Sequence, residues 1–490
     1  MTYCYHKGAS TICNNMTDPF HSTEPDSCLN GLLRNNTTMT LSDRLYRDVA
    51  GMIIDGSFAV GQQLPSVRDM AQRRSVSRDT VLRAYDRLVS SGRAHVVRGS
   101  GYFVAELDPS PSSIGSIDER HPQDPTWLLH SEFSLDHQPG SGILRHGGAA
   151  QVEVARVLRS VVASGFGLDS GYGDPLGYLP LRQQLQSALR QGGVDCAIDN
   201  IVTVPGATAG ISLVVRALLR AGSVALVEDP CSFIHMNTLM AQGAEIRRVP
   251  RLVDGPDMDV LRELCERYRP KLFVLSSLLH NPTGTTITLH KAQTLIEMAA
   301  EFGMVLIDDC SYADLLPRTE NQSMVPLILL DRLRWVIHIT GFSRTVSPAI
   351  GSGYVVAGEA HMRYIRAYRP VAGLGNMIVA ERTVYRLLNE GSYRRRCERI
   401  RASLACQMVA LRQHIASIGL PLPPSRPGMF LWLPLGDDVE SAAVGTRMSA
   451  RGFLTAPAKH FTPLQTAQSH MRFNVTTTSR NAVTALSACL

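Results

Sequence analysis

Lysine is the scarcest charged residue of this 490-residue chain. Of its 49 basic residues, four are lysines, at positions 7, 271, 291 and 459, and the other 45 are arginines. An arginine stays protonated at any pH that a protein survives, so it cannot replace a lysine in forming an imine with an aldehyde. Chemistry that needs an amine nucleophile therefore has only four side chains to draw on.

Other absences narrow the class of protein. The chain has no apolar run of about 18 residues, so no membrane-spanning helix is expected, and its first residues lack a basic-then-apolar signal pattern. The ten cysteines are scattered, without a CxxC pair or a His/Cys group at zinc spacing. We therefore expect reduced thiols, a cytoplasmic protein and no metal site. The mild net charge of +6 does not by itself indicate nucleic acid.

Residues 1–38 are polar, rich in Asn, Thr and Ser, and without periodicity. Such a composition predicts a disordered tail, because it offers too little apolar surface for a core. A start codon placed too early explains the stretch equally well, since Met39 stands just before the first patterned segment. We assign this tail no function.

Three short helices are predicted within residues 39–105. The first has apolar residues at helical spacing, at Leu41, Leu45, Val49 and Ile53. The second starts at Ser66, which together with Asp69 forms a capping-box pattern, and the third starts at Ser77, a good N-cap residue. Its apolar stripe consists of Val81, Tyr85 and Leu88.

A β-hairpin is predicted after these helices, because 95–97 and 102–104 flank the glycine-rich turn 98–101. Helices and hairpin together predict a winged helix-turn-helix, in which ten arginines against six aspartates over 41–104 give a net charge of +4. The alternative is a solvated, arginine-rich helical cap. As DNA-contacting residues we expect Arg68, Ser77, Arg78, Thr80, Arg83 and Arg98.

This segment closely resembles the GntR family of regulators. The matching stretches are Leu64-Pro65-Ser66-Val67-Arg68, the ten residues from Val76 to Tyr85, and Gly99-Ser100-Gly101-Tyr102-Phe103-Val104. The resemblance implies a double-stranded DNA operator as partner. Residues 106–125, rich in Pro, Ser and Asp, have the composition of a linker.

The rest of the chain alternates between strands and helices, which predicts an α/β fold with a mostly parallel sheet covered by helices on both faces. The candidate strands are 201–204, 224–228, 271–276, 304–309, 336–340 and 354–357. We expect a large domain over 126–375 and a smaller C-terminal α+β lobe over 376–490. Polar loops follow four of the strands, where ligands of such sheets bind. They are Gly206-Ala207-Thr208, Asn281-Pro282-Thr283-Gly284, Asp309 with Tyr312, and 341–348.

Residues 150–490 resemble fold-type I aminotransferases, and the whole chain is similar to the MocR subfamily of GntR regulators. Further marks are Tyr172-Gly173-Asp174-Pro175-Leu176-Gly177, Glu228-Asp229-Pro230 and Met471-Arg472-Phe473. The resemblance implies a homodimer and pyridoxal phosphate (PLP) as cofactor. It assigns Asp309 to the pyridine nitrogen, Asn281 and Tyr312 to the 3′-oxygen, Ala207, Thr208 and Ser343 to the phosphate, and Arg472 to a ligand carboxylate.

Three departures from the family pattern fall on the cofactor site. Arg344 stands where the family has the imine-forming lysine, Gly351 where an arginine binds the phosphate, and Ser232 where an aromatic ring stacks on the cofactor. No catalytic residue is therefore expected. Arg344 either turns toward the phosphate or pairs with Asp309 and fills the ring site; we favour the second, since Asp309 would otherwise be a buried, unpaired carboxylate.

Three functional hypotheses follow. The first is a DNA-binding transcription regulator whose aminotransferase-like domain dimerises and senses a small molecule, such as an amino acid or a vitamin B6 form, with covalent PLP chemistry lost. The second is a PLP-dependent enzyme or PLP-binding regulator that recruits another lysine, with Lys459 as the candidate. The third is a purely structural dimerisation body with an inactive pocket. We favour the first.

Overall fold

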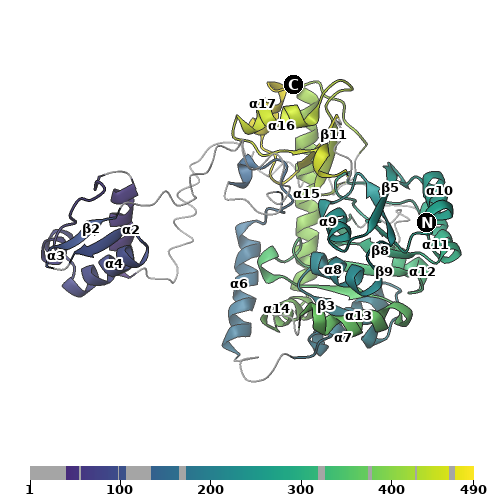
Figure 1. The fold of residues 1–490 in the computed structure, drawn as a ribbon, viewed down its shortest axis with the longest axis horizontal. Coiled ribbons are helices and arrows are strands. Elements are labelled where there is room, and N and C mark those ends of the chain that lie inside the picture. Colours follow the sequence, from purple (N-terminus) through teal and green to yellow (C-terminus); the bar gives the residue numbers. More distant parts are fainter. Residues whose placement is uncertain are drawn as a thin grey trace, which may run out of the picture. The chain divides into compact units, whose positions relative to one another are not determined.

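The computed structural model describes residues 40–54, 57–97, 99–105, 128, 134–164, 173–317, 326–373, 378–424, 427–462 and 469–490. The chain divides into two compact units, Met1–Ile114 and Gly115–Leu490 (Figure 1). The predicted tail and linker lie outside the described residues, so the proposed domain boundaries stay predictions. Among the described helices, none is both long and apolar enough to cross a membrane.

The first unit has the predicted three helices and hairpin. Helices α2 (Leu41–Ile54), α3 (Val67–Arg74) and α4 (Arg78–Ser90) precede strands β1 (Ala94–Val97) and β2 (Gly101–Val104), which pair antiparallel. Both predicted caps are present, because the Ser66 hydroxyl accepts from Asp69 N–H and the Ser77 hydroxyl from Thr80 N–H. The apolar stripe of α4 packs with α2 into one core that includes Val49, Val81, Tyr85 and Leu88.

The second unit is built on an eight-stranded sheet of order β3-β10-β9-β8-β7-β4-β5-β6. The strands are β3 (Ile201–Val204), β4 (Val224–Asp229), β5 (Glu245–Leu252), β6 (Gly255–Pro256), β7 (Leu272–Leu275), β8 (Val305–Asp309), β9 (Val336–Gly341) and β10 (Gly353–Val356). The central pairs are parallel, whereas β10 runs antiparallel to both of its neighbours. All six predicted strands are present, but β5 and β6 were not predicted.

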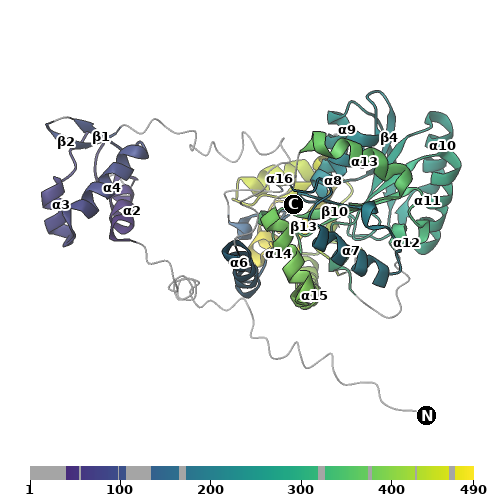
Figure 2. The same ribbon diagram turned by 90° about the horizontal axis from the view of Figure 1, so that it is seen from below.

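Helices cover both faces of this sheet. On one face α8 (Ala207–Leu218), α9 (Phe233–Ala241) and α13 (Glu359–Ala372) bury apolar residues against the strands. The opposite face is covered by α6 (Gly148–Ala163), α7 (Leu179–Gln191), α10 (Met258–Tyr268), α11 (Leu289–Phe302), α12 (Leu327–Asp331) and α14 (Ile378–Asn389). Figure 2 shows α8, α9 and α13 on one side and α7 and α12 on the other. The predicted α/β class is confirmed.

The C-terminal lobe has its own three-stranded antiparallel sheet of order β11-β13-β12. Its elements are β11 (Phe430–Pro434), α16 (Ser441–Ser449), β12 (Ala456–Pro457), β13 (His470–Asn474) and α17 (Arg480–Ser487). The long helix α15 (Ser392–Ser417) joins this lobe to the region of the large sheet (Figure 1). Tyr312, which follows β8, lies in the lobe's core with its ring centroid 5.4 Å from that of Phe430. The lobe therefore packs beside the ends of the large sheet's strands.

Candidate ligand pocket and DNA-binding surface

Helix α4 exposes the arginines that were predicted to contact DNA. Its buried positions, Val81, Ala84, Tyr85 and Leu88, lie on one face and leave Arg78 and Arg83 exposed to solvent. Arg68, on α3, is exposed as well. An exposed guanidinium on the third helix of such a unit is free to meet phosphate or a base edge.

The other residues predicted at this surface differ in their local partners. Arg83 pairs with Asp79 at 2.5 Å, one turn earlier on α4, whereas Arg78 forms no ion pair with any residue that the structure describes. Ser77 and Thr80 bond to each other through their hydroxyls at 2.8 Å, so both already serve the helix start. Arg98 lies outside the described residues. DNA contact by all six residues stays a prediction.

Eight residues predicted to surround the cofactor line a single cavity at the strand ends. Ala207 and Thr208 follow β3, Asn281 follows β7, and Asp309 ends β8. The other four are Tyr312, Ser343, Arg344 and Arg472, the last contributed by β13 of the C-terminal lobe. The cavity is partly open to solvent, and its lining combines polar and apolar side chains.

Asp309 is held at the cavity by a histidine that the sequence analysis missed. His235 Nε2 lies 2.9 Å from Asp309 Oδ2, and Ser311 donates to Oδ1 from both its backbone N–H and its hydroxyl. Burial opposes ionisation of Asp309, but His235 and then Ser311 outweigh it and lower the pKa of this carboxyl. A lone histidine on the buried face of the apolar helix α9 was the available sequence signal.

The predicted pair between Arg344 and Asp309 is wrong. Asp309 Oδ2 contacts His235 Nε2 at 2.9 Å instead. The guanidinium of Arg344 lies over the ring of Tyr312, with its Cζ 5.6 Å from the ring centroid. Because α9 supplies a buried partner for Asp309, this carboxylate does not need an arginine to balance its burial.

Arg472 is almost fully buried and makes contacts on several sides. It donates to Asn281 Oδ1 at 2.8 Å and to Gly140 O at 2.5 Å, and its Cζ lies 4.3 Å from the ring centroid of Phe430. Burial lowers the pKa of Arg472 to about 9; Tyr312 acts in the opposite direction and Arg344 adds to the lowering. At neutral pH the side chain is still a cation.

The start of α8 provides an anion-binding element at the same cavity. Gly206 precedes the helix with φ 104° and provides no side-chain cap, so the first backbone N–H groups are available to a ligand. The backbone is closely packed where Gly206 meets β10. A Cβ at Gly353 would lie 2.5 Å from Thr340 O and 3.1 Å from Gly206. Ser343, which follows the end of β9, adds a hydroxyl to the lining.

The described residues that line the cavity fit part of PLP but include no amine. Asp309 suits a pyridinium nitrogen, and the start of α8 suits a phosphate. However, none of the described lysines lines the cavity: Lys271 is exposed, Lys291 pairs with Asp254 at 2.7 Å, and Lys459 lies in the 3₁₀ turn Ala458–His460. The residues present therefore do not fit covalent attachment of this cofactor.

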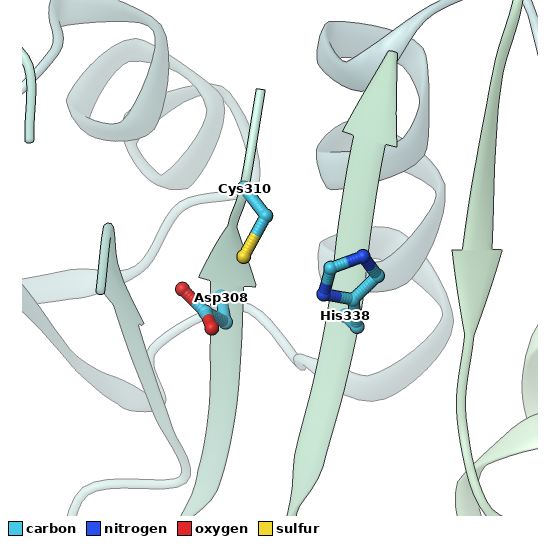
Figure 3. Close-up of side chains that lie close together, drawn as sticks. All are labelled: Asp308, Cys310 and His338. Atoms are coloured by element: carbon cyan, nitrogen blue, oxygen red, sulfur yellow. The ribbon is translucent and has the colours of Figure 1, made fainter. Parts of the chain in front are cut away.

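A second polar cluster lies on the opposite face of β8. Asp308 and Cys310 alternate with Asp309 along the strand, and His338 stands beside Asp308 on β9 (Figure 3). Their ligand atoms lie within 4.8 Å of one another, a grouping that could hold a metal ion. However, Ser277 donates to Asp308 from its N–H at 2.9 Å and its hydroxyl at 2.7 Å. We therefore interpret the cluster as a hydrogen-bonded support for the end of β8.

Two family models match the chain. "Aminotransferase class I and II" matches residues 140–488 and "Bacterial regulatory proteins, gntR family" matches 41–104. Among solved structures, the fold is similar to LysN, an alpha-aminoadipate aminotransferase from Thermus thermophilus, with TM-score 0.65 and 23% identity over 72% of this chain and 92% of LysN. It is also similar to a kynurenine aminotransferase of Pyrococcus horikoshii, with TM-score 0.66 and 19% identity. That match covers 74% of this chain and 92% of the aminotransferase.

Relatives that match most of this chain are named as regulators. The chain is 24% identical to the HTH-type transcriptional regulator YjiR of Escherichia coli, over 89% of this chain and 95% of YjiR. It is 22% identical to the HTH-type transcriptional regulator NorG of Staphylococcus aureus, over 77% of this chain and 87% of NorG. The two matches follow one another in the order that the predicted MocR-type arrangement requires. The chain belongs to the aminotransferase class I and II family and carries a GntR-type regulatory domain in front of it.

Proposed function

We propose that this protein is a DNA-binding transcription regulator whose aminotransferase-like domain dimerises and senses a small molecule without covalent PLP chemistry. The observation that carries the second half of this proposal is the cavity itself. It gathers the eight residues expected around the cofactor, yet an arginine, and no described lysine, lines it. Arg344 is proposed to occupy the position of the imine-forming lysine.

DNA binding is supported by the GntR-type segment and by the exposed arginines of α3 and α4. The relatives named as transcriptional regulators cover nearly the whole chain. One winged helix-turn-helix reads a short half-site, so a specific regulator needs two copies. Helix α6 exposes Val152 and Val162 while its other apolar face is buried, which is consistent with a further surface for a second copy.

A noncovalent vitamin B6 site is the second candidate, because Asp309 and the start of α8 suit the ring nitrogen and the phosphate. Recruitment of Lys459 is not favoured, since an imine requires the amine within bonding distance of the aldehyde and Lys459 does not line the cavity. Catalytic turnover is therefore not part of the proposal.

The regulator hypothesis can be tested by selecting duplexes from a random pool with the full chain. We expect enrichment of a site with two similar half-sites separated by whole helical turns. Binding to that site should weaken as salt rises, as phosphate contacts require. Failure to enrich any duplex at low salt would contradict DNA recognition.

A further inference from the structure

The cavity carries an unusual balance of charge. Two guanidinium groups, Arg344 and Arg472, line it together with one carboxylate, Asp309. Asp309 is ionised, because its hydrogen bonds favour the charged form, and it is paired with His235. These three groups therefore leave the cavity with one more positive charge than negative charge when His235 is neutral.

Arg344 has no acceptor within the part of the chain that the structure describes. Its guanidinium contacts the ring face of Tyr312, and neither a hydrogen bond nor an ion pair joins it to a described residue. A guanidinium has five N–H donors in a planar fork that matches a carboxylate or a phosphate. Because the side chain is only partly exposed and lines the cavity, an acidic group of a ligand is the partner that it lacks.

Arg472 offers a second, better-fixed position for an acidic group. It is only 2% exposed, it lies between the rings of Phe430 and Phe461, and its Nε has no partner among the described residues. Asp309 complements the two arginines with one acceptor position still open, since a carboxylate accepts about four hydrogen bonds and three donors, from His235 and Ser311, are in place.

We propose that the cavity binds, without a covalent bond, an amino acid that carries a second acidic group, and that Arg344 selects for this group. The α-carboxylate meets Arg472, the ammonium meets Asp309, and the second acidic group, a carboxylate or a phosphate, meets Arg344. Each charge of the ligand then faces an opposite charge of the cavity. This inference rests on the proposed sensing function and names the ligand class.

The test is calorimetric titration of the full chain with matched ligand pairs that differ mainly in charge. The pairs are L-glutamate with L-glutamine, L-aspartate with L-asparagine, and O-phospho-L-serine with L-serine. We expect the acidic member of at least one pair to bind about ten- to a hundredfold more tightly, as a charge-assisted hydrogen bond implies. The pair that shows this preference tells whether the second acidic group is a carboxylate or a phosphate.

Substitutions of the two cavity arginines show which of them selects the acidic ligand. Arg344→Gln should remove the preference for the acidic member, whereas Arg472→Gln should weaken the binding of both members. Arg262→Gln is the matched control, because Arg262 pairs with Glu301 on the surface and does not line the cavity. Thermal unfolding of each variant establishes that it is folded before titration.

Equal affinity for both members of every pair, or a preference that survives Arg344→Gln, would overturn the assignment. Binding of pyridoxamine phosphate alone would also overturn the ligand class, but it would leave the sensing function standing. A different result would contradict the proposed sensing function. In that case the full chain binds one of these ligands, but its affinity for a selected DNA site is the same with and without the ligand.

Discussion

The surface of α4 and the cavity of the aminotransferase-like unit use arginine in opposite ways. On α4, Arg78 and Arg83 are exposed, and their positions follow from a helix start at Ser77 and one buried stripe. In the cavity, Arg344 and Arg472 come from two different lobes, and Arg472 is held between two aromatic rings. The first site depends on local sequence, whereas the second depends on how distant strands come together.

The residue at position 344 gives the cavity a guanidinium in place of an amine, while the fold around it is retained. The strand ends, the start of α8 and the Asp309–His235 pair are all in place around Arg344. A lysine at the same position would meet the same surroundings. The proposed function and the proposed ligand class together describe an aminotransferase-like scaffold in which charge recognition replaces the covalent step.

The largest expected effect comes from Arg344→Lys. Because Asp309, Asn281, Tyr312 and the start of α8 already line the cavity, the new amine should form an adduct that borohydride traps, raising the labelled fraction well above that of the wild type. The measurement is intact-mass and peptide mass spectrometry after incubation with PLP. A variant that folds and remains unlabelled would show that the cavity differs from a PLP site in more than its lysine.

Gly353→Ala should destabilise the body strongly. The added Cβ would lie 2.5 Å from Thr340 O and 3.1 Å from Gly206, both backbone atoms that cannot rotate away. We expect a loss of about 2–4 kcal/mol in the free energy of unfolding, measured by urea denaturation. Gly148→Ala is the control, because its Cβ would meet nothing within 4 Å. Equal stability of the two variants would refute the tight packing of Gly353 against Thr340 and Gly206.

Neighbouring carboxyls on β8 should respond differently to pH. Burial raises the pKa of Asp308 to about 6, although hydrogen bonds from Ser277 oppose this, whereas the pKa of Asp309 is lowered. The folded state therefore binds the Asp308 proton more tightly than the unfolded state does, so the contribution of Asp308 to stability falls as pH rises from about 4 to about 6.

Asp308→Asn removes this titration. Relative to the wild type, the variant should gain stability between about pH 4 and pH 7, by on the order of 2–3 kcal/mol. Urea midpoints across that range check the sign. If the difference between variant and wild type is the same at all pH values, Asp308 does not titrate in this range.

Arg78→Ala should weaken binding to a selected DNA site by about 1–3 kcal/mol and leave folding intact. Arg83→Ala should have a smaller effect, because Arg83 already pairs with Asp79 at 2.5 Å and must give up part of that contact. Gel-shift titrations at fixed salt provide the comparison. Unchanged affinity for both variants would refute α4 as the recognition helix.

Much of this architecture could be predicted because it depends on short-range patterns. The caps at Ser66 and Ser77 and the six candidate strands follow from local composition, and all are present. Seven of the eight cavity residues could be brought together because parallel strands present their carboxyl ends at one edge, whereas Arg472, on β13, was assigned through the family resemblance. Their individual roles stay predictions.

What could not be predicted depends on tertiary contacts. The partner of Asp309 is His235, 74 residues earlier, and only the packing of α9 over the sheet brings them together. The strands of the C-terminal lobe are short and separated by helices and loops, so periodicity over a few residues did not reveal them. The orientation of Arg344 toward Tyr312 likewise follows from packing of the lobe rather than from sequence.

The central claim is that the wild-type cavity recognises charge and forms no imine. It is tested most directly by the visible absorption spectrum of the purified protein with added PLP, followed by borohydride reduction and mass spectrometry. We predict no protonated-imine band and no lysine adduct above the level of a denatured control. A stoichiometric adduct on any lysine, Lys459 included, would contradict the account and restore the enzyme hypothesis.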